Sequence, residues 1–278
     1  MRWMIVLFCY MFCIYCDHQD FIKSYLKKIP YTTSYASGLD CIDCIYVINL
    51  EKHPKRWERM EQQLSDLGLY AQRMEAVDGW GFNKHALKNL YHKLLQPSYE
   101  KFSISPGQIG CFLSHMSILE DAFNKNYSTI WILEDDCEIS QNLRRDFSKI
   151  FEELYEKNIS WDALFTDTGS RYRHADGTLE RYEFDTMCQK FIKSCSLLKK
   201  NQQESLIHTT WIQRRLGMYS VILSRSGIKK IREYFMTHRL RAAYDVDIHF
   251  IPGKRFLQTQ EDVVSTQGGF GSSTAKNR

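Results

Sequence analysis

Ser128-Thr-Ile-Trp-Ile-Leu-Glu-Asp-Asp136 carries the strongest structural signal in this chain, a short β-branched apolar run that stops abruptly on three carboxylates. Such a run predicts a strand that is covered on both faces, as in a parallel sheet. In sheets of this kind, ligands bind just beyond the carboxyl ends of the strands. Three adjacent carboxylates repel one another in a half-buried crevice, which favours a shared divalent cation with a diphosphate as co-ligand. The same stretch, taken alone, is equally consistent with a solvated turn.

Composition indicates a globular protein with one large domain or slightly more. The chain has 278 residues, of which 44% are hydrophobic and 25% charged, and this is enough to build a substantial core. Its net charge of +4 is mild for the length, so no nucleic-acid partner is expected. Nine cysteines, mostly within apolar runs, indicate a reducing compartment and structural thiols. Cys41-x-x-Cys44 lacks the second ligand pair that zinc needs, which favours a structural role there too.

The two ends of the chain differ from its middle. Residues 1–16 form a nearly uninterrupted apolar run, shorter than the roughly 20 residues that span a bilayer. This run fits a signal peptide, a signal anchor or an interfacial segment. We expect a linker over 17–41, a catalytic domain over 42–266 and a flexible tail over 267–278. The expected location is cytoplasmic, with peripheral association at the inner face of the membrane through the apolar run.

The domain opens with a predicted βαβ unit. A strand over 42–50 is followed by a helix that begins near Pro54 and ends before Gly68, and a second strand over 71–77 leads to Asp78. The loop after the first strand carries Asn49 and Arg56, which suit an anionic ligand. The alternative for Arg56 is a solvated position at the start of the helix, where it adds about 0 to 1 kcal/mol to folding stability.

A second informative helix follows Ser105, which suits an N-cap, with Pro106 in the first turn. Gly110 and Cys111 are small enough to let another element approach closely. His115 lies one position off the apolar face and, considered alone, is typical of a satisfied core histidine. Strands over 162–167 and 218–223 and a helix over 224–237 complete an α/β pattern.

Four blocks of this sequence resemble glycosyltransferase family 25, which groups bacterial lipopolysaccharide glycosyltransferases with procollagen galactosyltransferases. In chain order they are Tyr46-Val-Ile-Asn-Leu50, Glu75-Ala-Val-Asp-Gly79, Gly107-Gln-Ile-Gly-Cys-Phe-Leu-Ser-His115 and Leu133-Glu-Asp-Asp136. Fainter similarity extends the resemblance to about residues 42–250, including Val246-Asp247. Gln108 stands where the family commonly has Glu, so no carboxylate role carries over to that position. Residues 171–213 match no motif and suit either an acceptor-specific insertion or a surface hairpin.

The resemblance implies an α/β, GT-A-like nucleotide-sugar fold with a mostly parallel central sheet flanked by helices. It also implies a hexosyltransferase that moves galactose or glucose from a UDP-sugar to a surface glycan such as lipopolysaccharide, or to a lipid-linked glycan, with Mn²⁺ or Mg²⁺ as cofactor. Asp136 and Glu134 are the expected metal ligands, and Asp247 and His115 the expected catalytic residues. The expected donor-binding residues are Asn49, Arg56, Asp78, Glu134 and Asp135.

Two other functions remain open from the sequence. A metal-dependent phosphohydrolase or nuclease also uses acids at strand ends, although such enzymes usually recruit ligands from several loops. A non-catalytic module that binds nucleotide-sugars or glycans is the other alternative, and the loss of a carboxylate at Gln108 is the feature that favours it.

Overall fold

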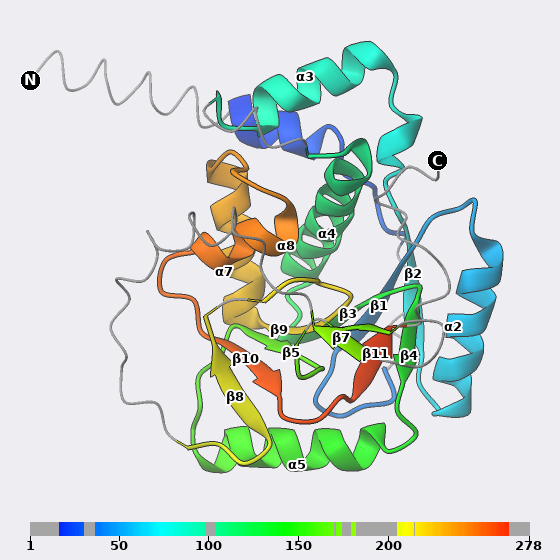
Figure 1. Ribbon diagram of the computed structural model, residues 1–278, viewed down its shortest axis with the longest axis vertical. Helices are drawn as coiled ribbons and strands as arrows, with labels where there is room; N and C mark the ends of the chain where they lie inside the picture. Colours follow the sequence, from blue (N-terminus) through cyan, green and yellow to red (C-terminus); the bar gives the residue numbers. More distant parts are fainter. Residues whose placement is uncertain are drawn as a thin grey trace, which may run out of the picture.

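A seven-stranded mixed sheet forms the centre of the molecule (Figure 1). The computed structural model describes residues 17–30, 37–97, 104–169, 171–173, 179–181, 205–213 and 215–266. In spatial order the strands are β2 (Ala71–Glu75), β1 (Cys44–Asn49), β3 (Thr129–Glu134), β9 (Ser220–Ser224), β5 (Ala163–Phe165), β10 (Phe256–Thr259) and β8 (Thr209–Ile212). Only β9 and β8 run against the other five. The expected α/β fold with a mostly parallel sheet is therefore confirmed.

Helices cover both faces of this sheet. They are α2 (Pro54–Asp66), α3 (Lys84–Leu94), α4 (Pro106–Asn124), α5 (Leu143–Glu156), α7 (Arg225–Thr237) and α8 (Tyr244–Asp247), with the 3₁₀ turns η1 (Gly79–Gly81) and η3 (Ile248–Phe250). Two small antiparallel pairs stand apart from the sheet, β4 (Cys137–Ile139) with β11 (Val264–Thr266) and β6 (Arg171–Arg173) with β7 (Leu179–Arg181). The predicted elements are present with shorter strands than the sequence indicated.

Successive residues of the central strands enter opposite cores. On β3, Ile130 and Ile132 join the core under α4 and α7, whereas Trp131 and Leu133 join the core under α2 and α5. This alternation follows from the two-residue period of a strand. The expectation that the run before Glu134 is covered on both faces is confirmed.

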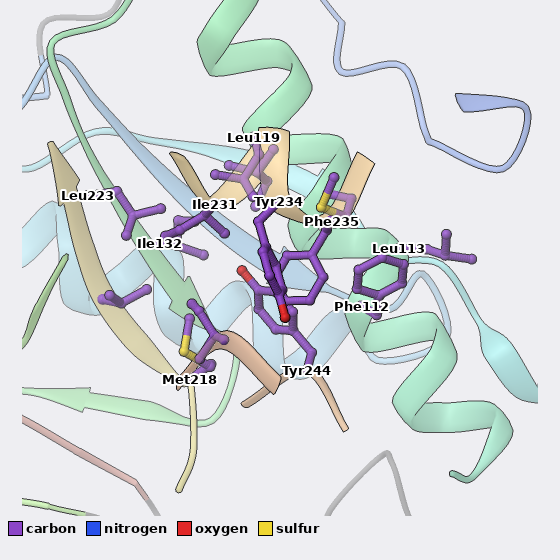
Figure 2. Packing of buried hydrophobic residues seen from close by; sticks show 14 of the residues in the cluster. Phe112, Leu113, Leu119, Ile132, Met218, Leu223, Ile231, Tyr234, Phe235 and Tyr244 are labelled. Carbon is purple, nitrogen blue, oxygen red and sulfur yellow. The ribbon is translucent and has the colours of Figure 1, made fainter. Parts of the chain in front are cut away.

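Aromatic side chains connect α4, α7 and α8 above the sheet (Figure 2). The ring of Phe112 on α4 lies 5.5 Å from that of Phe235 on α7 and 6.0 Å from that of Tyr244 on α8. Tilted and edge-on rings at these distances stabilise the packing beyond the apolar area that they bury. This cluster fixes α4 and α8 relative to each other.

The beginning of α4 lies directly against the loop that follows β2. A Cβ atom on Gly110 would lie 2.3 Å from the carbonyl oxygen of Val77, and one on Gly79 would lie 1.7 Å from that of Pro106. Both distances exclude any side chain, so glycine is required at both positions. The close approach predicted at Gly110 is thus present, and it places the first turns of α4 at the carboxyl edge of the sheet.

Residues 17–30, expected to belong to a linker, are folded onto the domain. Residues 17–23 are helical, and Ile22 is buried in the core at 1% exposure. The backbone N–H of Lys27 donates to Ser117 Oγ of α4 over 2.9 Å. This difference arises because Phe21, Ile22, Tyr25 and Leu26 recur at helical spacing and cover the apolar core.

The described residues leave out both ends of the chain. Residues 1–16 and 267–278, expected to be an apolar segment and a flexible tail, lie outside the described residues. Within the described ranges, no helix is long and apolar enough to cross a membrane. Cys41 and Cys44 are free thiols, and burial raises the pKa of each to about 11.

Candidate active site at the carboxyl ends of the strands

A pocket of about 620 Å³, counting the space open to solvent, lies where β1, β2 and β3 end. Its walls come from the ends of these strands, from the loop 76–80 and from one side of α4. The structure brings five of the predicted site residues together in its lining: Arg56, Asp78, Glu134, Asp135 and Asp136. The position agrees with the rule that ligands of α/β sheets bind beyond the carboxyl ends of the strands.

The three carboxylates at the end of β3 have different surroundings. Asp135 is only 7% exposed, and its Oδ2 accepts a hydrogen bond from Asn49 Nδ2 over 2.7 Å. Its Oδ1 forms an ion pair with Arg56 Nη1 at 3.1 Å. The alternative that Arg56 is a solvated residue is wrong, because its side chain is only 10% exposed and neutralises a buried acid.

Asn49 lies behind the pocket, at 1% exposure, and is absent from its lining. Its Oδ1 accepts a hydrogen bond from Arg73 Nη2 over 2.6 Å, while its Nδ2 donates to Asp135 and to the carbonyl of His53. A side-chain amide with all these bonds has little capacity left for a ligand. Asn49 therefore holds Asp135 in position, and the hydrogen bond between the two residues joins the ends of β1 and β3.

Glu134 and Asp136 lie where their surroundings disfavour the ionised form of both carboxyl groups. Burial raises the pKa of Glu134 to about 8, and the charges of Asp136, Asp135 and Asp245 act in the same direction. Burial also raises the pKa of Asp136, helped by Asp135, although Arg56 opposes it. Within the described part of the chain, Asp136 Oδ1 is buried without a hydrogen-bond partner. Such a pair of acids is suited to bind a cation.

These acids fit a divalent ion only as a partial ligand set. No group of three or more His, Cys, Asp or Glu side chains in the described ranges is arranged to hold a metal. Two carboxylates plus oxygen atoms from a phosphorylated substrate and water are a usual set for Mg²⁺. Glu134 and Asp136 therefore fit a metal that binds together with its substrate.

Asp78 also lines the pocket, but its carboxylate has protein partners. Its Oδ2 is 2.6 Å from Lys52 Nζ. Its Oδ1 accepts the backbone N–H of Trp80, so that Asp78 is the N-cap of the η1 turn. The Asp78 side chain is 36% exposed, so it stays accessible from the open side of the pocket.

His115 is completely buried and does not belong to the pocket lining. Its Nδ1 lies 3.0 Å from the carbonyl oxygen of Cys111, and its ring centroid lies 4.8 Å from that of Tyr244. Burial lowers its pKa to about 4, so the imidazole is neutral at physiological pH. The neighbouring Ser114 does line the pocket, and its Oγ accepts the N–H of Val77 over 2.9 Å.

The structure separates Asp247 from the pocket lining. Asp247 is fully buried, and its Oδ2 accepts the backbone N–H of Arg241 over 2.5 Å. Burial raises its pKa to about 6. Asp245, which sequence reasoning missed, acts electrostatically on the pocket because its charge raises the pKa of Glu134. Its Oδ2 accepts the N–H of Gly217 over 3.0 Å. The only sequence signal was its position two residues before Asp247.

Gln108, the departure from the family pattern, belongs to the helix cap of α4. Its backbone N–H donates to Ser105 Oγ, and its side-chain oxygen accepts the backbone N–H of Ser105 over 2.8 Å. In this capping box, glutamine and glutamate perform the same task. The replacement therefore does not remove a carboxylate from the pocket, which weakens the reason to favour a non-catalytic module.

Comparisons with known proteins find one matching family model and several relatives of this chain. The sequence model described as "Glycosyltransferase family 25 (LPS biosynthesis protein)" matches residues 42–249. The human "Inactive glycosyltransferase 25 family member 3" is 33% identical over 126 residues, which cover 44% of this chain and 21% of that protein. Mouse "Procollagen galactosyltransferase 2" is 29% identical over 126 residues, covering 44% and 20%. A "Glycosyltransferase 25 family member" of Aedes aegypti is 29% identical over 147 residues, covering 52% and 23%. The chain thus spans about a fifth of the length of these relatives.

Proposed function

Since this chain belongs to glycosyltransferase family 25, we propose that it transfers a hexose, galactose or glucose, from a UDP-sugar to a sugar of a surface glycan such as lipopolysaccharide. The observation that carries this proposal is the uneven neutralisation of the acids in the pocket. Asp135 has Arg56 and Asn49 as partners, whereas Glu134 and Asp136 have raised pKa values beside it. A site with two uncompensated acids is suited to receive a metal-bound diphosphate.

In this proposal, Glu134 and Asp136 hold Mn²⁺ or Mg²⁺, which when bound neutralises the diphosphate leaving group as a Lewis acid. Arg56 holds Asp135 in place through their ion pair, so that the acids on either side of it keep their positions. Val77 and Trp80 provide an apolar wall on the loop after β2, which offers the donor a surface that excludes water.

The acceptor hydroxyl needs a general base within hydrogen-bond reach. Asp247 was expected in this role, and its carboxylate is instead engaged by the backbone of Arg241 in the interior. Asp245 lies outside the pocket lining as well, but its charge acts on Glu134 and Cys111, two residues of that lining. We therefore propose Asp245 as the base to be tested and a supporting role for Asp247.

A panel of UDP-sugars with Mn²⁺ tests the proposal. The full chain should release UDP from one donor of the panel, and faster when a hexose-terminated glycan is supplied. Asp136→Asn should release none, whereas Glu61→Gln, an exposed site on α2, should match the wild type. Phosphate release from unrelated esters without UDP release would instead indicate the phosphohydrolase, which the family match disfavours.

A non-catalytic module that binds nucleotide-sugars is the second candidate, because the human relative that is 33% identical is named inactive. It predicts saturable binding of a UDP-sugar, measured by calorimetry, with no turnover under any metal or acceptor. Under the transferase proposal, the same preparation releases UDP.

A further inference from the structure

The outer face of α3 is basic and carries no acid. Its sequence contains Lys84, Lys88 and Lys93, and among the named α-helices of the described ranges it alone lacks Asp and Glu. Lys84 and Lys88, spaced one turn apart, are exposed, whereas Leu90 on the opposite side is fully buried. Within the described part of the chain, neither Lys84 nor Lys88 forms an ion pair. Isolated lysines such as these usually belong to a solvated face, and a neighbouring segment is what distinguishes this one.

The second feature is the helix over 17–23, which lies beside α3 at one end of the molecule (Figure 1). Asp17 Oδ2 is 2.9 Å from Lys93 Nζ, and the same ammonium lies 5.9 Å from the centroid of the Phe21 ring. Exposed Lys23 and Lys28 extend the basic surface along this segment. The two segments contact each other, and we name four of their exposed lysines, Lys23, Lys28, Lys84 and Lys88, the basic patch; Asp17 and Asp20 of the first segment are exposed as well.

The third feature is the sequence that immediately precedes this helix. Residues 1–16 are almost entirely apolar, and Cys16 is bonded to Asp17, which is anchored to α3. An apolar run of this length is too short to span a bilayer comfortably. Stable attachment to a membrane usually needs two signals, such as an apolar group and a polybasic surface. In this sequence, the apolar run directly precedes the segment that contacts α3.

We propose that the basic patch docks on a membrane surface that contains anionic lipids, next to the point where the apolar run joins the domain. The ammonium groups of Lys84 and Lys88 lie at the level of the phosphate headgroups, together with those of Lys23 and Lys28. The proposal concerns a surface outside the pocket lining, although Lys84 follows the lining residue Trp80 by four positions, and it does not depend on the transferase activity. It gives the protein a fixed orientation on the membrane.

The test compares binding of the full chain to phosphatidylcholine vesicles with and without phosphatidylglycerol, by co-sedimentation. The variant Lys84→Gln/Lys88→Gln is matched by Lys149→Gln/Lys229→Gln, which removes the same charge from exposed sites on α5 and α7. Since each lysine near an anionic surface strengthens binding roughly fivefold, the α3 variant should partition about 25-fold more weakly at low salt. The control variant should bind like the wild type, and both should melt at the wild-type temperature.

Two results would overturn the proposal. If the wild type shows no preference for vesicles with phosphatidylglycerol, the apolar run alone accounts for any binding. If the two double variants weaken equally, binding follows overall charge and not this patch. High salt should reduce the preference of the wild type more than that of the α3 variant, which keeps Lys23 and Lys28, because the lost contribution is electrostatic.

Discussion

Replacing Glu134 by Gln is expected to stabilise the substrate-free protein at neutral and alkaline pH while removing its activity. The carboxylate is buried at the end of β3, and the charges of Asp136, Asp135 and Asp245 surround it. A neutral amide of similar shape keeps the packing and removes a group that holds its proton when folded and loses it on unfolding. The substitution thereby separates what the site needs for function from what the fold needs for stability.

The size of the effect follows from the pKa of Glu134, which is raised from 4.5 to about 8. Between these two pH values the unfolded chain has lost the proton and the folded protein still holds it. Stability of the wild type therefore falls as pH rises through this window and is constant above it. At pH 7, about 2.5 units above the unfolded pKa, the penalty reaches at most about 3 kcal/mol. Sharing of the proton with Asp136 makes the measured value smaller.

Urea denaturation at pH 5 and pH 8 measures this penalty. Glu134→Gln should be more stable than the wild type by at least about 1 kcal/mol at pH 8 and by much less at pH 5. Glu61→Gln, on the exposed side of α2, serves as the control and should show no such pH dependence. A variant that is equally shifted at both pH values, or less stable at pH 8, would refute the idea that Glu134 is held among uncompensated acids.

The remaining predictions concern four other residues of the site and its supports. Asp136→Asn should abolish transfer without lowering the melting temperature, and wild-type turnover would remove the metal proposal. Arg56→Ala should destabilise folding by about 3 kcal/mol in urea titrations, because Asp135 loses its cation in the interior, and a loss below 1 kcal/mol would contradict the buried pair. Gln108→Glu should match the wild type in stability and turnover, whereas Gln108→Ala should lose about 1 kcal/mol with its cap. His115→Gln should melt earlier yet turn over normally while folded, and the reverse result would return His115 to the catalytic machinery.

Local sequence patterns predicted much of the fold because they reflect local physics. Ser105 was expected to cap a helix, and its side chain accepts the N–H three residues ahead; Ser224 caps α7 in the same way. The strand predicted over 71–77 ends at Glu75 in the structure, because its partner β1 ends at Asn49, whose carbonyl accepts the N–H of Ala76 as the last bond of the pair. Strand ends of this kind depend on a partner strand that sequence spacing does not locate.

The division of tasks among the three acids was not predicted. β3 ends at Glu134, and Asp135 and Asp136 lie in the turn before β4, so the two-residue period of a strand does not sort them. The partners of Asp135 could not be read from the chain, because Asn49 and Arg56 are 86 and 79 residues away in sequence. Likewise, the spacing of Asp245 and Asp247 does not show which carboxylate accepts the backbone N–H of Arg241; in the structure it is that of Asp247.

The electrostatic design of the pocket follows from combining these contacts. Neutralised Asp135 ties the ends of β1 and β3 together, and the glycine contacts between Gly79 and Pro106 hold α4 against the same edge. A rigid frame of this kind prevents Glu134 and Asp136 from relaxing away from each other, so their repulsion persists in the empty site. A bound cation would relieve that repulsion and lower both pKa values, which is why ligand binding and stability should be coupled at this pocket.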